Sequence, residues 1–153
     1  MTQLTSLGPA FKDAFFTAAT NLYSAAATQV AFGHPGQRQA DEIVAFMEFN
    51  SEAEPVTLGT RRQFNEVVNL TVLISVWQGG GDAATEKSTS DRALAILGDL
   101  ENYARVTNTT FDGLLLYCYR TSYQVTTTPD EFLASGRLTE ISAVFTAVGR
   151  IIS

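Results

Sequence analysis

The chain has 153 residues, of which 45% are hydrophobic, so it is long enough to form one domain (residues 1–153) around a buried core. Its formal net charge is −6, and an acidic chain lacks the basic surface with which proteins grip the phosphates of nucleic acids. It contains no apolar run of the roughly 18 residues that span a bilayer, and its first residues do not predict a signal peptide.

The first predicted element is a helix that begins after Gly8-Pro9, because proline suits the first helical turn. Its apolar residues recur at steps of three and four, as on one face of a helix: Phe11, Phe15, Ala18, Leu22 and Ala26. Residues 33–38 are rich in turn formers and predict a loop. The alternation that follows predicts a strand over residues 42–50, and residues 51–55 predict a turn.

The longest predicted strand leads from Phe64 to Trp77. Its even-numbered positions are almost all apolar, which places one face of the strand in a core: Phe64, Glu66, Val68, Leu70, Val72, Ile74 and Val76. At about 3.3 Å per residue this strand spans roughly 46 Å, whereas a compact domain of 153 residues is about 40 Å across. We therefore expect the strand to bend strongly or to project, and so to offer unpaired backbone groups to a neighbour.

A second helix is predicted over residues 83–105, because Asp82 is a suitable N-cap and apolar residues follow at helical spacing. The next strand is predicted to carry one face composed of Leu115, Tyr117, Tyr119, Thr121, Tyr123 and Val125. Residues 129–135 predict one helical turn. The closing segment 138–152 fits both periods, and its Thr, Val and Ile content favours a strand. This order predicts an α+β fold, a mostly antiparallel sheet flanked by two helices.

The sequence contains no set of residues that predicts catalysis. Lys87-Ser88 follows a glycine run, but Glu86 stands where a phosphate-binding loop requires its final glycine. His34 is the single histidine and lies among turn residues, which excludes a metal site of several histidines within one chain. Cys118 is the single cysteine, and a lone thiol on a strand face is usually a small apolar group. We expect no enzymatic activity, cofactor or metal.

Two further groups of side chains have a structural and a functional interpretation. The acidic residues Glu48, Glu52 and Glu54 lack the interleaved oxygen donors of a calcium loop, so we expect a solvated acidic turn. The tyrosines at strand spacing favour core or interface packing, with the wall of a ligand pocket as the alternative: Tyr117, Tyr119 and Tyr123.

Three segments carry a family resemblance. They are the run from Arg61 to Glu66 with the strand that follows it to Trp77, the helical run Ala93–Leu100, and the closing run Gly136–Ile151. Together they resemble the tail terminator proteins of long-tailed, siphovirus-like bacteriophages, over nearly the whole chain and by element order. The resemblance implies an α+β domain and a hexameric ring that caps the tail tube, ends its polymerisation and provides the surface for head joining.

The same resemblance implies the partners and the location. The partners are other copies of the chain, the tail tube protein and a head-completion or connector protein, within a virion assembled in the host cytoplasm. Genomic DNA would pass through the lumen at the head–tail junction without sequence-specific binding, and we expect the net charge of −6 to make that lumen acidic. Candidate contacts between subunits or with the tube are Arg61, Arg62, Phe64, Glu66 and Trp77.

Two alternatives remain at this stage. One is another neck or tail-completion protein, or the tail tube subunit itself. The other, from a different class, is a small oligomeric ligand-binding or enzymatic α+β domain that uses the tyrosines and Cys118.

Overall fold

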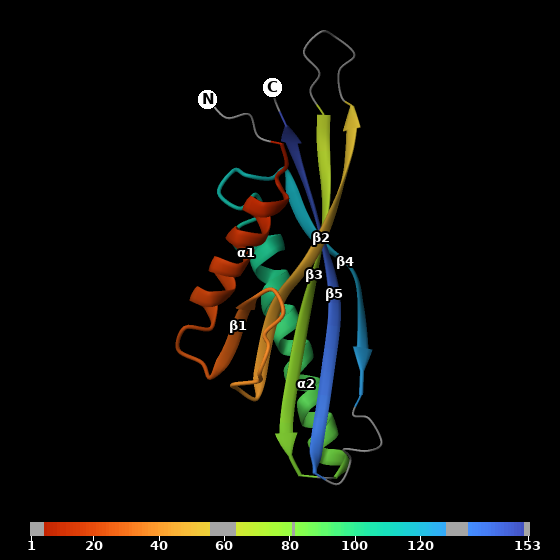
Figure 1. The fold of residues 1–153 in the computed structure, drawn as a ribbon. Coiled ribbons are helices and arrows are strands. Elements are labelled where there is room, and N and C mark those ends of the chain that lie inside the picture. The colour runs from red at the N-terminus through yellow and green to blue at the C-terminus, as the bar shows by residue number, and fades with distance from the viewer. Residues whose placement is uncertain (1–4, 56–63, 81, 128–134, 152–153) are drawn as a thin grey trace.

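The structure is a computed structural model, and it describes residues 5–55, 64–80, 82–127 and 135–151. Figure 1 shows an elongated molecule in which a twisted sheet runs the full length and two helices lie against it. In chain order the elements are α1 (Gly8–Leu22), β1 (Thr28–Phe32), β2 (Glu42–Pro55), β3 (Phe64–Gly79), α2 (Ala83–Asn102), the π-helical turn η1 (Tyr103–Thr107), β4 (Tyr117–Thr126) and β5 (Gly136–Ile151). The α+β class predicted from the sequence is confirmed.

The five strands form one sheet in the order β1-β2-β3-β5-β4. Neighbouring strands are antiparallel except β1 and β2, so the predicted, mostly antiparallel sheet is confirmed. The central pair, β3 and β5, is in register from Phe64 opposite Ile151 to Gly79 opposite Gly136. The closing segment is therefore a strand, because its backbone hydrogen bonds are made with β3 along its whole length.

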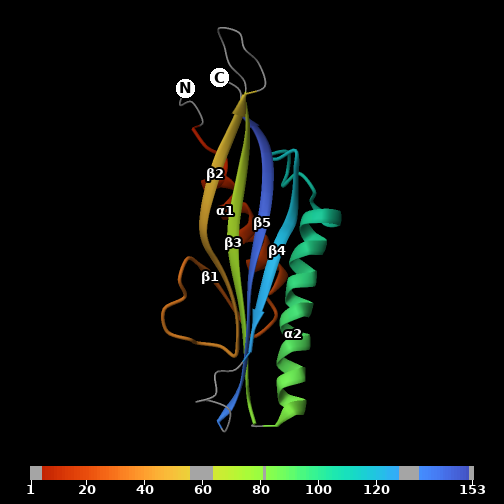
Figure 2. The ribbon, with the colours of Figure 1, turned by 90° about the vertical axis from the view of Figure 1, so that its right-hand side faces the viewer.

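The core lies between one face of the sheet and the two helices. The even-numbered residues of β3 from Val68 to Val76 are buried, as the alternation predicted, and the odd-numbered residues of β5 from Ile141 to Ala147 join them. Phe15 of α1 is central, because its ring lies 5.2 Å from that of Phe46 and 5.0 Å from that of Phe145. Figure 2 looks at the opposite face, here termed the open face, with α1 behind the strands and α2 beside β4.

The first helix is shorter than predicted, and a strand that the sequence did not predict follows it. α1 ends at Leu22, so Ala26 lies in a turn and not on the helix. Residues Thr28–Phe32 then pair in parallel with residues 42–46 of β2. The alanines before β1 favour a helix locally, but pairing with β2 is a tertiary interaction that overrides this weak preference.

The strand β2 is longer than predicted, and the predicted turn over residues 51–55 is wrong. These residues pair with β3, from Ser51 opposite Val68 to Pro55 opposite Phe64. Their polar side chains are exposed, which is why the sequence pattern indicated a turn. The predicted helical turn over residues 129–135 lies outside the described residues, apart from Ser135.

The second helix begins where the sequence predicted. The side chain of Asp82 accepts a hydrogen bond from the backbone N–H of Thr85 at 2.8 Å, which caps the first turn. α2 ends at Asn102, before the predicted end at residue 105, and the π-helical turn η1 follows it directly from Tyr103 to Thr107.

The predicted tyrosine face of β4 is wrong, because a β-bulge interrupts the alternation. The register against β5 shifts by one residue at Thr121. Tyr117 and Tyr119, which precede the bulge, lie on the open face. Tyr123, which follows it, lies on the helix side, with its ring centre 4.5 Å from the Arg120 guanidinium. All three tyrosines are exposed, so none belongs to the core.

Candidate functional site

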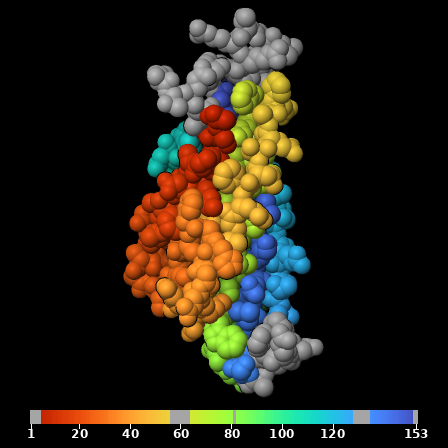
Figure 3. Space-filling model, in the orientation of Figure 1, coloured from red at the N-terminus to blue at the C-terminus, as the bar shows by residue number. Residues whose placement is uncertain are grey.

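The part of the sheet most available to another molecule is the outer edge of β2. β1 pairs only with residues 42–46, so Met47–Pro55 has β3 on one side and no strand of the described chain on the other. We term Met47–Pro55 the free β2 edge. Figure 1 shows β2 and β3 continuing past the ends of both helices, and Figure 3 shows β2 at the molecular surface there. Backbone groups along such an edge can bind a further strand.

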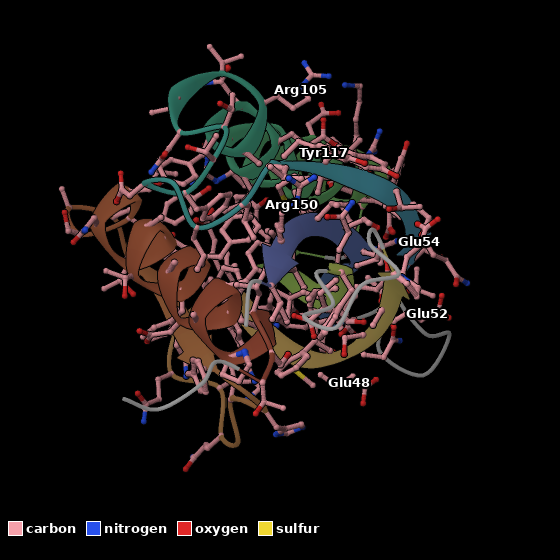
Figure 4. The ribbon with its side chains drawn as sticks, turned by 90° about the horizontal axis from the view of Figure 1, so that it is seen from above. Glu48, Glu52, Glu54, Arg105, Tyr117 and Arg150 are labelled. Atoms are coloured by element: carbon pink, nitrogen blue, oxygen red, sulfur yellow. The ribbon has the colours of Figure 1, made fainter. Side chains whose placement is uncertain are left out.

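The free β2 edge is acidic. Glu48, Glu52 and Glu54 are exposed, and none of them takes part in an ion pair with the described residues. They are exposed, as predicted, but they lie on a strand, so the predicted turn is wrong. Figure 4 shows them following one another along one side of the molecule. Nothing in the described chain neutralises this row of carboxylates.

Most arginines of the described chain are engaged by groups of the same chain. Arg92, Arg120 and Arg137 form ion pairs with Glu42, Glu101 and Glu86, at 2.7, 2.7 and 2.9 Å respectively. Arg38 donates to the backbone oxygens of Ala40 and Asp41 at 3.0 and 2.7 Å. Arg105 and Arg150 are also exposed and form no ion pair within the described ranges, although Arg150 donates from Nε to the side-chain oxygen of Asn65 at 3.4 Å.

Arg105 and Arg150 lie next to exposed apolar side chains. Arg105 belongs to η1, which packs beside the start of β4. There, Val106 is 67% exposed, Leu116 48% and Tyr117 50%. Figure 4 shows Arg105, Tyr117 and Arg150 in one region, apart from Glu48 and Glu52. We term Arg105, Val106, Leu116, Tyr117 and Arg150 the arginine corner, and its mixture of Arg, Tyr and aliphatic groups is typical of protein interfaces.

The sequence reasoning did not identify the arginine corner. A single arginine carries no local signal, because the sequence does not show which arginines have a carboxylate partner. Tyr117 was identified, but as part of a stripe that the bulge divides. The charge excess predicted carboxylates without a cation, as on the free β2 edge, but it does not predict arginines without a carboxylate.

The residues predicted as contacts do not form one patch. Arg61 and Arg62 lie outside the described residues. Phe64 and Trp77 lie near opposite ends of β3, with Phe64 packed against the core and the Trp77 ring over Gly136. A contact role for these four residues stays a prediction.

Glu66, the fifth predicted contact, is 4% exposed. Its carboxylate accepts hydrogen bonds from the Ser6 hydroxyl, at 2.7 Å, and from the backbone N–H of Leu7. In the single chain it therefore holds the start of α1 against β3. Any contribution of Glu66 to an interface would act through the position of α1.

The side chains considered above for catalysis or phosphate binding are either buried or bound to other groups of the chain. Burial raises the pKa of the Cys118 thiol to about 12, so the thiol is protonated at neutral pH. His34 Nδ1 accepts from the backbone N–H of Gly36 at 3.0 Å, and Lys87 pairs with Asp91 at 2.6 Å. In the described ranges no three His, Cys, Asp or Glu side chains come together as a metal site would require.

Two grooves of the described chain could in principle hold a ligand, as the ligand-binding alternative requires. One, of about 260 Å³, lies between α1 and the loop after η1, and the other, of about 350 Å³, lies where β2 begins. Neither of these two grooves is lined by Cys118 or by the tyrosines of β4, the residues named for that alternative. Among the described helices, none combines the length and the hydropathy of a membrane-spanning segment.

Comparison with known proteins gives a structural likeness and no family. No protein-family model matches the chain, and no curated protein matches it. Among solved structures, a chain of the virion of a native gene transfer agent (GTA) particle is similar, with a TM-score of 0.51 and 16% identity. The match covers 98% of this chain and 100% of that chain. At this identity the likeness shows the fold alone.

Proposed function

We propose that the protein is a structural component of a phage-like virion, and specifically a tail terminator that forms a ring, most simply a hexamer. The observation that carries the proposal is the free β2 edge, which extends the sheet past the helices and has no partner strand in the described chain. In a monomer, the exposed backbone groups of this edge could pair with strands of other molecules and cause aggregation. In a closed ring, the same edge is covered on every copy.

The likeness to a virion chain supports this proposal. It spans 98% of the chain, so the whole α+β unit is shared and not a fragment of it. The described parts of the segments that resemble tail terminators lie on β3, α2 and β5. The proposal assigns the chain no catalytic role, and its partners are other copies, the tail tube protein and a head-completion protein.

The charge of the chain is compatible with a ring through which DNA passes. With a net charge of −6, the surface repels phosphates, so DNA would slide through the lumen without being retained. A basic lumen in an image of the assembled ring would contradict this part of the proposal.

Two measurements test the proposed function. Light scattering and electron microscopy of the purified full chain should show single rings, whereas growing tubes would favour the tube subunit. Phage particles made without this gene should carry overlong tails, because nothing would end the polymerisation of the tube. Tails of normal length would contradict the terminator role while leaving a virion role intact.

A further inference from the structure

We propose that neighbouring subunits of the ring meet through the free β2 edge of one copy and the arginine corner of the next. The inference rests on the proposed ring and names the two surfaces that close it. The partner is therefore a second copy of this chain, bound through surfaces that differ in composition. Such a heterologous contact generates a closed ring when the rotation between copies divides a full turn.

The free β2 edge and the arginine corner are complementary in charge. The free β2 edge carries three exposed carboxylates without a cation, and the arginine corner carries two exposed guanidinium groups without a carboxylate, among the residues described. Within a copy the described residues of the two surfaces form no ion pair with one another. In the sheet register, Asn65 lies between Glu54 and Arg150, which places the Cα atoms of these two residues two strands apart, or roughly 10 Å. Arg150 donates to the Asn65 side chain at 3.4 Å.

The two surfaces lie at the two outer strands of the sheet. The arginine corner includes the start of β4, which is the other outer strand of the sheet. No strand of the described chain pairs with the outer side of β4, although η1 packs beside its start. Placing the free β2 edge of one copy beside β4 in the next would bring the outer strands of two sheets together.

The two surfaces also lie at the same level of the sheet. Glu52 is opposite Val67 in β3, Val67 is opposite Val148 in β5, and Val148 is opposite Tyr117 in β4. Glu52 and Tyr117 therefore mark the two ends of one row across four strands. A closed ring has no rise from copy to copy, so surfaces at one level can meet when the ring axis runs along the strands.

Charge reversal tests the contact. In E52R/E54R both surfaces of a copy are basic, and in R105E/R150E both are acidic, so neither variant should form rings alone. We expect the concentration needed for half-assembly to rise on the order of tenfold or more for each variant. An equimolar mixture should recover rings of alternating subunits, because every contact then joins opposite charges.

The controls separate a lost contact from a lost fold. D13K changes an exposed carboxylate on α1, away from both surfaces, and should assemble as the wild type does. Circular dichroism of each variant reports whether it is folded. If both reversals assemble normally, or if folded variants fail to recover on mixing, the contact is wrong although the ring stands. A wild-type chain that stays monomeric at every concentration overturns both the contact and the ring.

Discussion

The hydroxyl of Ser6 donates a hydrogen bond to the buried carboxylate of Glu66 across 2.7 Å, and so joins the start of α1 to the middle of the sheet. The backbone N–H of Leu7 donates to the other carboxylate oxygen. Two donors that precede the first helical turn thus share one acidic side chain of β3. The negative charge also lies at the positive end of the helix dipole.

The first prediction concerns this link. Glu66→Ala should lower the free energy of unfolding by about 1–3 kcal/mol, because it leaves buried donors without an acceptor. Urea unfolding of the purified variant measures the change. Asp13→Ala, at an exposed position of α1, is the matched control and should stay within about 0.5 kcal/mol of the wild type. Equal effects of the two substitutions would show that the link adds nothing.

The second prediction concerns two glycines. A Cβ at Gly136 would lie 2.4 Å from atoms of the Trp77 ring, so Gly136→Ala should destabilise the fold by about 1–3 kcal/mol. Gly98→Ala places a methyl group on an exposed part of α2 with no atom within 4 Å. That substitution should stabilise the fold by up to about 1 kcal/mol, because alanine favours the helix. Thermal unfolding compares the pair, and a harmless Gly136→Ala would refute the packing of Trp77.

The third prediction concerns the ion pair between α2 and β2. Arg92 donates from Nε to Glu42 Oε2 at 2.7 Å and from Nη2 to Oε1 at 3.0 Å. The hydrogen bonds from Arg92 are the main reason that the pKa of Glu42 is lowered. A lowered folded-state pKa means that this stabilisation is present at neutral pH and disappears as the pH falls through that pKa.

Glu42→Gln should therefore cost about 1 kcal/mol or less at pH 7, since the pair is partly exposed. The difference between wild type and variant should shrink at acidic pH, where Glu42 of the wild type is protonated. Denaturant unfolding at several pH values measures both. A difference that stays constant down to the acid limit would show that the charge of Glu42 does not contribute.

The fourth prediction concerns alkaline pH. Burial raises the pKa of Cys118 from 9.0 to about 12, and burial with the nearby Asp99 also raises the pKa of Tyr23. Between pH 9 and 12 the unfolded thiol loses its proton while the folded thiol keeps it, so the stability of the fold should fall as the pH rises. Cys118→Ala should flatten this fall, and Tyr23→Phe should flatten a separate part of it. If the dependence of stability on pH is the same in both variants as in the wild type, Cys118 and Tyr23 are not its cause.

Those buried groups also predict reactivity. Iodoacetamide should modify Cys118 slowly in the native chain at pH 8 and much faster in urea, because the thiol is 5% exposed. Mass spectrometry follows the modification. Rapid labelling of the native protein would show that the edge of the sheet beside β4 opens readily.

Part of the fold and part of the candidate site could be predicted from the sequence. The alternation in β3 identified its buried face, because side chains of any strand point alternately to its two sides. The acidic balance and Asp82 as the N-cap of α2 followed in the same way from local chemistry. For the glutamates of the free β2 edge the sequence predicts a turn where the structure has a strand, because exposed polar residues are also typical of loops.

By itself the sequence determined the class of the fold, the buried face of β3 and the excess of negative charge, since each depends on residue type and on a local repeat. The tertiary structure decided where β1 forms, where the bulge divides the tyrosines of β4, and which arginines remain without a carboxylate. It also decided that Glu66 faces the start of α1. Each of these depends on which distant strand or helix becomes a neighbour, and contacts between distant segments leave no periodic trace in the chain.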